Sequence, residues 1–181
     1  MGQSICRNRT RSRRSNWFRR VISRNKWSNN DKNTMMDRNK LIEELKFDEG
    51  FIDEIYEDHL GLATFGVGHL ILEHDPEFGK PVGTPVSDAR IRECLNNDID
   101  IVCSELDKNL PWWRGLGNVR QRVLANMCFN LGYPRFSKFK KFLEAVKKED
   151  WETAGVEMLD SKWATQVGDR AIRLKEKMYN G

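Results

Sequence analysis

Two carboxylates, Glu49 and Asp58, have types and positions that suit acid–base chemistry. Glu49 follows an apolar helical stripe and precedes Gly50, which predicts that it lies in the last turn of a helix. The helix dipole opposes a negative charge in that place, so such a charge needs a reason. Asp58 opens the sequence Asp58-His59-Leu60-Gly61, which predicts a turn. On position alone, a solvent-exposed helix end and an Asx turn explain these two residues better than catalysis does.

A third carboxylate, Asp98, lies seven residues after Ile91, on the apolar face of a predicted helix. An unpaired buried carboxylate is unfavourable, so we expect a partner, and His69 is one of few candidate cations nearby in sequence. His69 alone fits a structural histidine better than a ligand. We expect no metal site, no cofactor and a reduced thiol pool, because no CxxC pair or metal-like spacing occurs among the four cysteines, Cys6, Cys94, Cys103 and Cys128.

The elements that must position these residues can be read from caps and periodicity. Asp37 is expected to cap a helix whose buried stripe is Leu41, Ile42 and Leu45. Two short strands follow, and Gly66 and Gly68 indicate bulges or a close approach of the backbone. These two strands are expected at 55–56 and 62–67. A loop over 70–86 rich in Gly and Pro follows them, and then a helix from Ser87 to about Asp107.

From residue 110 onward the apolar residues recur at helical spacing in four stripes. The sequence therefore predicts an α+β, mostly helical fold. Its expected parts are a small β-containing lobe (37–86), a connecting helix (87–108) and a helical lobe (109–181). Residues 41–120 carry 7 basic and 17 acidic side chains, and residues 121–181 carry 12 basic and 8 acidic ones. Two lobes on one helix are expected to enclose a cleft, a usual place for a site.

The chain begins with a strongly basic arm, residues 1–36, which we expect to be disordered. Residues 1–40 hold 12 basic and 2 acidic residues, and nothing in the chain approaches the roughly 18 consecutive apolar residues of a membrane span. Residues 17–24 form a short basic amphipathic segment that suits an anionic membrane or lipopolysaccharide. Nucleic acid is the competing partner, and a solvated tail is the simplest alternative. A translation start at Met35 or Met36 would leave the arm outside the protein.

The residues that carry the candidate chemistry also form an ordered motif. Glu49-Gly50 is followed by the Asp58–Gly61 turn and then by the run TFGVGH, residues 64–69. This pattern resembles the phage-type lysozymes, the muramidases of glycoside hydrolase family 24. The resemblance covers about residues 37–178 and continues through NDID, ANMCFNLG and SKWATQVGDRAIRL, residues 97–100, 125–132 and 161–174.

The resemblance implies hydrolysis of the β-1,4 bond between N-acetylmuramic acid and N-acetylglucosamine in peptidoglycan. A proton for the leaving oxygen and a second carboxylate are the groups that such a cleavage needs. The family pattern makes Glu49 the general acid and Asp58 the second carboxylate, and Thr64 helps to place the attacking water. That arrangement implies inversion, for which the carboxyl groups stand about 6.5–9.5 Å apart.

Further roles are implied by the same resemblance. Leu70 and Phe129 match residues that line the saccharide cleft, and Arg170 matches an arginine that pairs with the catalytic Glu. His69 and Asp98 match a structural ion pair. No role is carried over to Phe142 or Glu157, which differ in type from the family's cleft residues.

We expect a monomeric endolysin that waits in the host cytoplasm and reaches the wall through a holin. A virion-borne lysin and an organelle-targeted enzyme remain open. The alternative is a weakly active, lysozyme-like binding module whose arm, residues 1–34, targets anionic envelope or nucleic acid.

Overall fold

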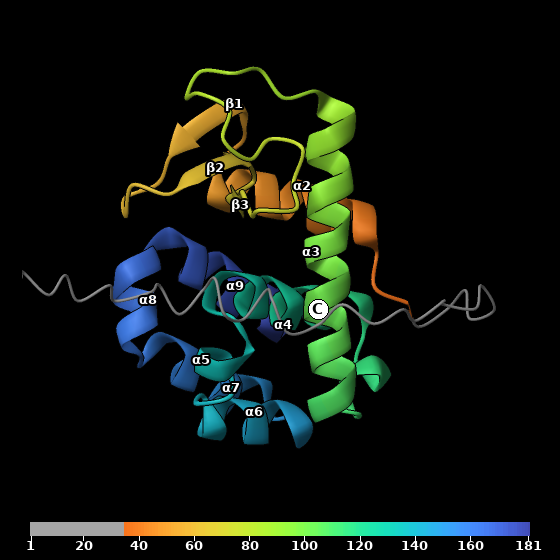
Figure 1. The fold of residues 1–181 in the computed structure, drawn as a ribbon. Helices are drawn as coiled ribbons and strands as arrows, with labels where there is room; N and C mark the ends of the chain where they lie inside the picture. Colours follow the sequence, from red (N-terminus) through yellow and green to blue (C-terminus); the bar gives the residue numbers. More distant parts are fainter. Residues whose placement is uncertain (1–34) are drawn as a thin grey trace, which may run out of the picture.

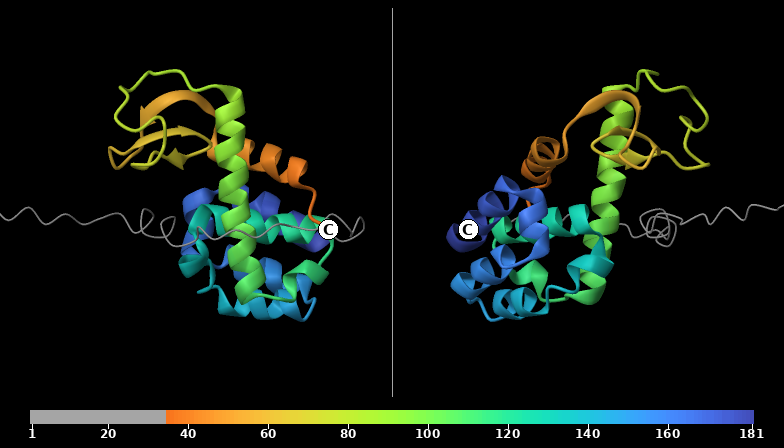
Figure 2. Two further views of the ribbon diagram at one scale, coloured as in Figure 1. Left: turned by 45° about the vertical axis from the view of Figure 1, so that its right-hand side comes forward. Right: turned by 90° about the vertical axis from the view of Figure 1, so that its left-hand side faces the viewer.

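One long helix, α3 (Asp88–Asn109), connects a small lobe that carries a β-sheet with a larger helical lobe (Figure 1). The two further views show the same arrangement, with the sheet at one end of α3 and the helices packed around the other (Figure 2). The computed structural model describes residues 35–181, so the expectations for the basic arm and for Cys6 lie outside the described residues. The other elements are α2 (Arg38–Glu49), β1 (Ile52–Glu57), β2 (Ala63–Gly66), β3 (His69–Leu70), η1 (Trp113–Gly115), α4 (Asn118–Leu131), α5 (Tyr133–Phe136), α6 (Lys140–Lys147), α7 (Trp151–Leu159), α8 (Lys162–Val167) and α9 (Asp169–Asn180).

Side-chain caps set the beginnings of the helices that the sequence predicted. Asp37 accepts a hydrogen bond from the backbone N–H of Lys40 (3.1 Å), and Ser87 accepts one from the N–H of Arg90 (3.3 Å). These bonds satisfy N–H groups that have no partner inside the helix. The expected α+β, mostly helical class is confirmed.

The sheet is a three-stranded antiparallel meander in the order β1-β2-β3. Its register pairs Tyr56 with Thr64 and Thr64 with Leu70, and an irregularity in β1 lies between Ile52 and Tyr56. The two expected strands are present, but β3 was not predicted because two residues carry no alternating pattern. Gly66 shows the close approach that was expected, since a Cβ there would lie 2.7 Å from the side chain of Ile91.

Two hydrophobic clusters hold the fold together. The smaller one lies between the sheet and the first turns of α3, and its members are Ile55, Phe65, Ile71, Val86, Ile91 and Cys94. The larger one fills the helical lobe, and it includes the apolar stripe of α2 together with Met36. By packing, therefore, α2 belongs with the helical lobe rather than with the sheet that follows it in sequence, and Met36 belongs to the body rather than to the arm.

The helical stripes are buried or half-buried, with one exception. All seven apolar residues of the α3 stripe are buried, and Phe142, at 1% exposure, packs edge-on against Phe136 and Phe139. Leu159, which the periodicity placed in a stripe, is 40% exposed because α7 ends there. Within residues 35–181, no helix has both the length and the apolar character that a membrane crossing requires.

Candidate active site

Glu49 is the last residue of α2, as the sequence predicted. The helix stops there because Gly50 adopts φ +84°, a left-handed conformation that glycine reaches without a steric penalty. The N–H of Gly50 donates to the carbonyl of Lys46 (3.1 Å) and closes the final turn. The Glu49 side chain is 18% exposed, so its carboxyl group is largely enclosed yet reachable from solvent.

Two donors from the helical lobe converge on one oxygen of Glu49. Arg170 of α9 donates from Nη1 to Oε1 (2.9 Å), and Asn130 of α4 donates from Nδ2 to the same oxygen (3.1 Å). The structure thus brings together Glu49 and Arg170, which lie 121 residues apart in the sequence. A guanidinium at this distance stabilises the negative charge that Glu49 carries after it gives up a proton.

A buried polar network holds Arg170 in place. Arg170 is 5% exposed, and its guanidinium donates to Oδ1 of Asn126 from Nε (3.0 Å) and Nη2 (2.8 Å). Asp48 accepts from Asn126 (2.8 Å), lies 3.5 Å from Nε of Arg170, and pairs with Arg173 (2.7 Å). Sequence reasoning missed Asp48, Asn126 and Asn130, because a single polar residue inside an apolar stripe is the only local signal they leave.

Asp58 begins the turn between β1 and β2, as expected. Its Oδ1 accepts from the backbone N–H groups of Leu60 (2.8 Å) and Leu62 (3.0 Å). The turn closes through the N–H of Gly61, which donates to the carbonyl of Asp58 (2.8 Å). Two bonds to Oδ1 fix the orientation of the carboxylate, so Oδ2 is the oxygen that can accept from a water or a substrate.

Thr64 lies in β2 between its register partners Tyr56 and Leu70. It is 3% exposed, and its hydroxyl donates to the carbonyl of Leu62 (3.0 Å). Because the proton is used in that bond, the lone pairs of the hydroxyl are oriented to accept. Leu70 is half-buried beside Thr64, and Phe129 is half-buried in α4, where it packs against the larger cluster.

His69 and Asp98 form an ion pair, with Nδ1 and Oδ2 3.1 Å apart. Burial lowers the pKa of His69, but the hydrogen bond and charge of Asp98, with a smaller contribution from Cys94, outweigh it and raise the pKa from 6.5 to about 10. Nε2 lies 3.6 Å from Oδ2 of Asp75, too far for a hydrogen bond. The pair joins β3 to α3, and it answers the question of which cation partners the buried Asp98.

A second charged cluster ties the loop 70–86 to α3. Arg90 donates to Asp75 (2.9 Å), to Glu77 (3.1 Å) and to Glu93 (3.0 Å). Glu77 is 6% exposed, so this loop buries a carboxylate against α3. The sequence predicted only a Gly/Pro-rich loop here.

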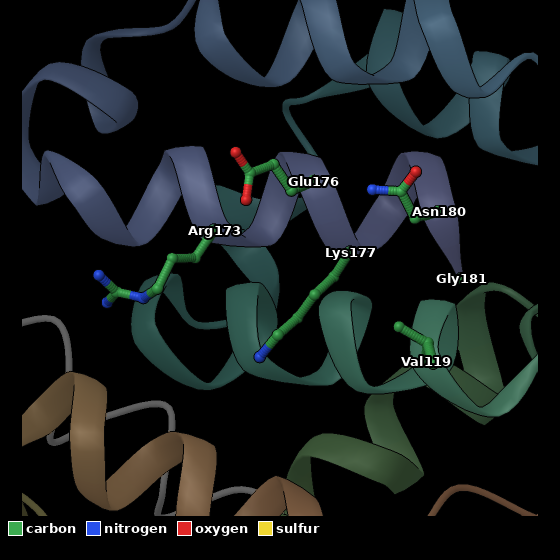
Figure 3. A pocket seen from close by; sticks show the side chains of 6 residues that line it. All are labelled: Val119, Arg173, Glu176, Lys177, Asn180 and Gly181. Carbon is green, nitrogen blue, oxygen red and sulfur yellow. The ribbon is translucent and has the colours of Figure 1, made fainter.

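A pocket of about 410 Å³ lies away from these residues, between α9 and the start of α4 (Figure 3). Arg173 and Lys177 extend from α9 on one side of it, and they pair with Asp48 and Glu44 of α2. Its lining within residues 35–181 is Val119, Arg173, Glu176, Lys177, Asn180 and Gly181, so none of the candidate site residues takes part.

Comparison with known proteins shows to which family this chain belongs. The family model for phage lysozyme matches residues 46–177. Two probable T4-type lysozymes of Dictyostelium discoideum are 29% and 28% identical over 74% and 76% of this chain and 90% and 92% of their own lengths. A pre-baseplate central spike protein of Enterobacteria phage T4 is 30% identical over 78% of this chain and 28% of its own length. The chain therefore belongs to the phage lysozyme family and is a glycoside hydrolase.

Proposed function

We propose that this protein hydrolyses the β-1,4 bond between N-acetylmuramic acid and N-acetylglucosamine in bacterial peptidoglycan, with inversion at the anomeric carbon. The observation that carries the proposal is the carboxyl group of Glu49, held by Arg170 of α9 and reachable from solvent. Muramidase-like chemistry is also what the family and the names of the relatives support.

In the first part of the reaction, the carboxylic acid of Glu49 gives its proton to the leaving glycosidic oxygen. The carboxylate that remains is stabilised by the Arg170 guanidinium 2.9 Å away. Arg170 is itself fixed by Asn126 and Asp48, so the stabilising charge does not have to reorganise during proton transfer.

In the second part, Asp58 and Thr64 orient a water molecule on the opposite face of the sugar. Oδ2 of Asp58 accepts one proton of the water, while two backbone bonds hold Oδ1. The Thr64 hydroxyl, whose proton is bound to the carbonyl of Leu62, accepts a hydrogen bond from the O–H that the water keeps, and this O–H becomes the new anomeric hydroxyl. Leu70, beside Thr64 in the sheet, and Phe129 in α4 supply apolar contacts to the saccharide.

The first test is the release of reducing ends from purified murein by the full chain and its variants. Glu49→Gln and Asp58→Asn should each lower kcat by about 100-fold or more and leave the melting temperature unchanged within a few degrees. Glu43→Gln, an exposed carboxylate six residues earlier in α2, is the matched control and should keep full activity. A Glu49→Gln variant that degrades murein at the parent rate would overturn the mechanism.

The second test follows the anomeric form of the newly released reducing end by proton NMR during the first minutes of reaction. An inverting enzyme produces the α-anomer first, because water attacks the face opposite the leaving group. Initial appearance of the β-anomer would show retention and would exclude the water-attack role proposed for Asp58 and Thr64.

We also propose that the enzyme acts at the end of a phage infection, held in the host cytoplasm until a holin opens the route to the wall. A central spike protein among the relatives supports the alternative of a virion-borne enzyme that acts on infection, and the Dictyostelium lysozymes support a free-standing lysozyme in other settings. Immunodetection of the protein in purified virions and in lysates of infected cells separates the first two settings, because a virion-borne enzyme would be found in the virions.

For the basic arm we propose an accessory role on anionic envelope. Deleting residues 1–34 should reduce killing of intact Gram-negative cells more than cleavage of purified murein. Equal losses on both substrates, or none on either, would contradict that role. Loss of most murein cleavage on deletion would instead favour a binding module that depends on its arm.

A further inference from the structure

A chain of two hydrogen bonds leads from the core of the helical lobe to Glu49. The indole Nε1 of Trp163 in α8 donates to Oδ1 of Asn130 in α4 (2.8 Å), and Nδ2 of Asn130 donates to Oε1 of Glu49 (3.1 Å). Trp163 is only 4% exposed, and its ring packs edge-on against Phe139 with 6.1 Å between the ring centroids. The indole N–H is therefore a donor in a fixed place.

The indole determines which way the amide of Asn130 faces. The nitrogen of a Trp side chain can only donate, so the group that Asn130 turns toward Trp163 must be its carbonyl oxygen. The NH₂ group then faces Glu49, and the opposite orientation would set two donors against each other at Trp163. Asn130 can consequently act toward Glu49 only as a donor.

The same reasoning applies to the oxygen that receives this bond. Oε1 of Glu49 accepts from Nδ2 of Asn130 (3.1 Å) and from Nη1 of Arg170 (2.9 Å). A guanidinium and an amide NH₂ have no lone pair that could accept a proton from a carboxylic acid. A proton placed on Oε1 would lose both of these bonds, whereas a proton on Oε2 keeps them.

We propose that Asn130 and Trp163 are positioning residues that keep the acidic proton of Glu49 on Oε2. The inference rests on the proposed role of Glu49 as general acid and adds the groups that decide which of its oxygens carries the proton. A proton held on one oxygen, on a carboxyl group that cannot rotate freely, is presented to the glycosidic oxygen in one geometry. Neither residue takes part in the chemistry, because Asn130 acts through Glu49 and Trp163 acts through Asn130.

Asn130→Ala and Asn130→Asp test the proposal in the full-length chain on purified murein. Asn130→Ala removes the donor, so kcat should fall about 10-fold to 100-fold while KM changes less than about threefold. Asn130→Asp keeps the shape and the bond from Trp163 but sets a second carboxyl oxygen against Oε1. The two carboxyl groups then share a proton, so the alkaline limb of kcat against pH should move up by about one unit or more, with a lower maximum rate.

Trp163→Phe tests the outer bond, because it removes the indole N–H that donates to Oδ1 of Asn130. Its kcat should fall about threefold to 10-fold, in the same direction as in Asn130→Ala. The matched control is Trp113→Phe, which removes another buried indole N–H, one that donates to Asp107 of α3 (2.7 Å). That variant loses stability but should keep kcat and its pH profile when assayed below its melting temperature.

The outcomes separate this inference from the proposed function. If Glu49→Gln is inactive but both Asn130 variants keep the parent kcat and pH profile, the positioning role is wrong and the proposed acid stands. A fall in kcat in Asn130→Ala without any movement of the pH profile in Asn130→Asp would also overturn the role, because it indicates support of the fold alone. If Glu49→Gln is fully active, the proposed function itself has failed. A Trp163→Phe chain that does not fold leaves the decision to the two Asn130 variants.

Discussion

Replacing Asp98 by Asn should remove a large part of the pH-dependent stability of the fold. In the native structure the His69 imidazolium lies 3.1 Å from Asp98, and the hydrogen bond and charge of Asp98, with a smaller contribution from Cys94, outweigh the cost of burying the ring. A pKa raised from 6.5 to about 10 corresponds to roughly 5 kcal/mol of stabilisation when it is fully developed.

The direction of the pH dependence follows from the sign of this shift. The folded-state pKa of His69 lies above its ordinary value, so the stabilisation is complete below pH 6.5 and disappears as the pH rises to about 10. Between these limits the free energy of unfolding should fall by up to about 1.4 kcal/mol per pH unit from this residue alone. The Asp98→Asn variant should lack most of that slope and should be less stable by about 3–5 kcal/mol near pH 6.

Urea unfolding between pH 5.5 and 9.5 measures both effects. At this chain length a loss of that size corresponds to a melting temperature lower by about 8–15 °C. Asp100→Asn is the matched control, since Asp100 is half exposed on the same helix and its pair with Arg38 should contribute less than about 1 kcal/mol. A His69→Gln/Asp98→Asn double variant completes the thermodynamic cycle. Equal pH slopes in the parent and Asp98→Asn, or a His69 imidazole that titrates near 6.5 by NMR, would refute the reasoning.

Three further predictions concern packing, the loop 70–86 and the thiols. Gly66→Ala should lower the free energy of unfolding by about 2–4 kcal/mol, because φ is +65° and the new Cβ would lie 2.7 Å from the Ile91 side chain in α3. Gly68→Ala has open space around the new Cβ, so it should lower the free energy of unfolding by only about 1–2 kcal/mol. Arg90→Met should destabilise by about 2–4 kcal/mol and expose the loop to limited proteolysis, because Glu77 stays buried without its partner, while the exposed Arg92→Met should do neither. The buried thiols of Cys94, Cys103 and Cys128 should resist iodoacetamide at pH 8 in the native protein and react on unfolding. Burial shields all three and raises the pKa of Cys103 and Cys128, and peptide mass mapping would show which thiols react.

Local chemistry in the sequence was enough to predict most of the small lobe. Asp37, Ser87 and Gly50 were recognised as helix ends because a cap bonds to backbone groups within four residues of itself. The Asx turn at Asp58 was recognised for the same reason. The isolated carboxylate Asp98, on an apolar face, was enough to predict that a partner exists, and His69 is that partner.

What the sequence could not show is how polar residues from separate helices meet. The pairs of Glu49 with Arg170 and with Asn130 span 121 and 81 residues, and no periodic pattern records such a contact. The pairing with Arg170 was expected only through a family resemblance, and Asn130 was not expected at all.

The sequence by itself determined the local parts of this protein: the helix that ends in Glu49, the turn that presents Asp58 and the apolar faces that demand a core. Only the tertiary structure decided that α2 packs into the helical lobe and that Glu49 therefore meets donors from α4 and α9. The physical reason is that backbone preferences and caps act over a few residues, whereas an apolar stripe shows that a helix face is buried without showing against what. Local signals therefore place the Glu49 carboxyl group at the end of its helix. Only the packing of the helices decides that its partners are Arg170 and Asn130.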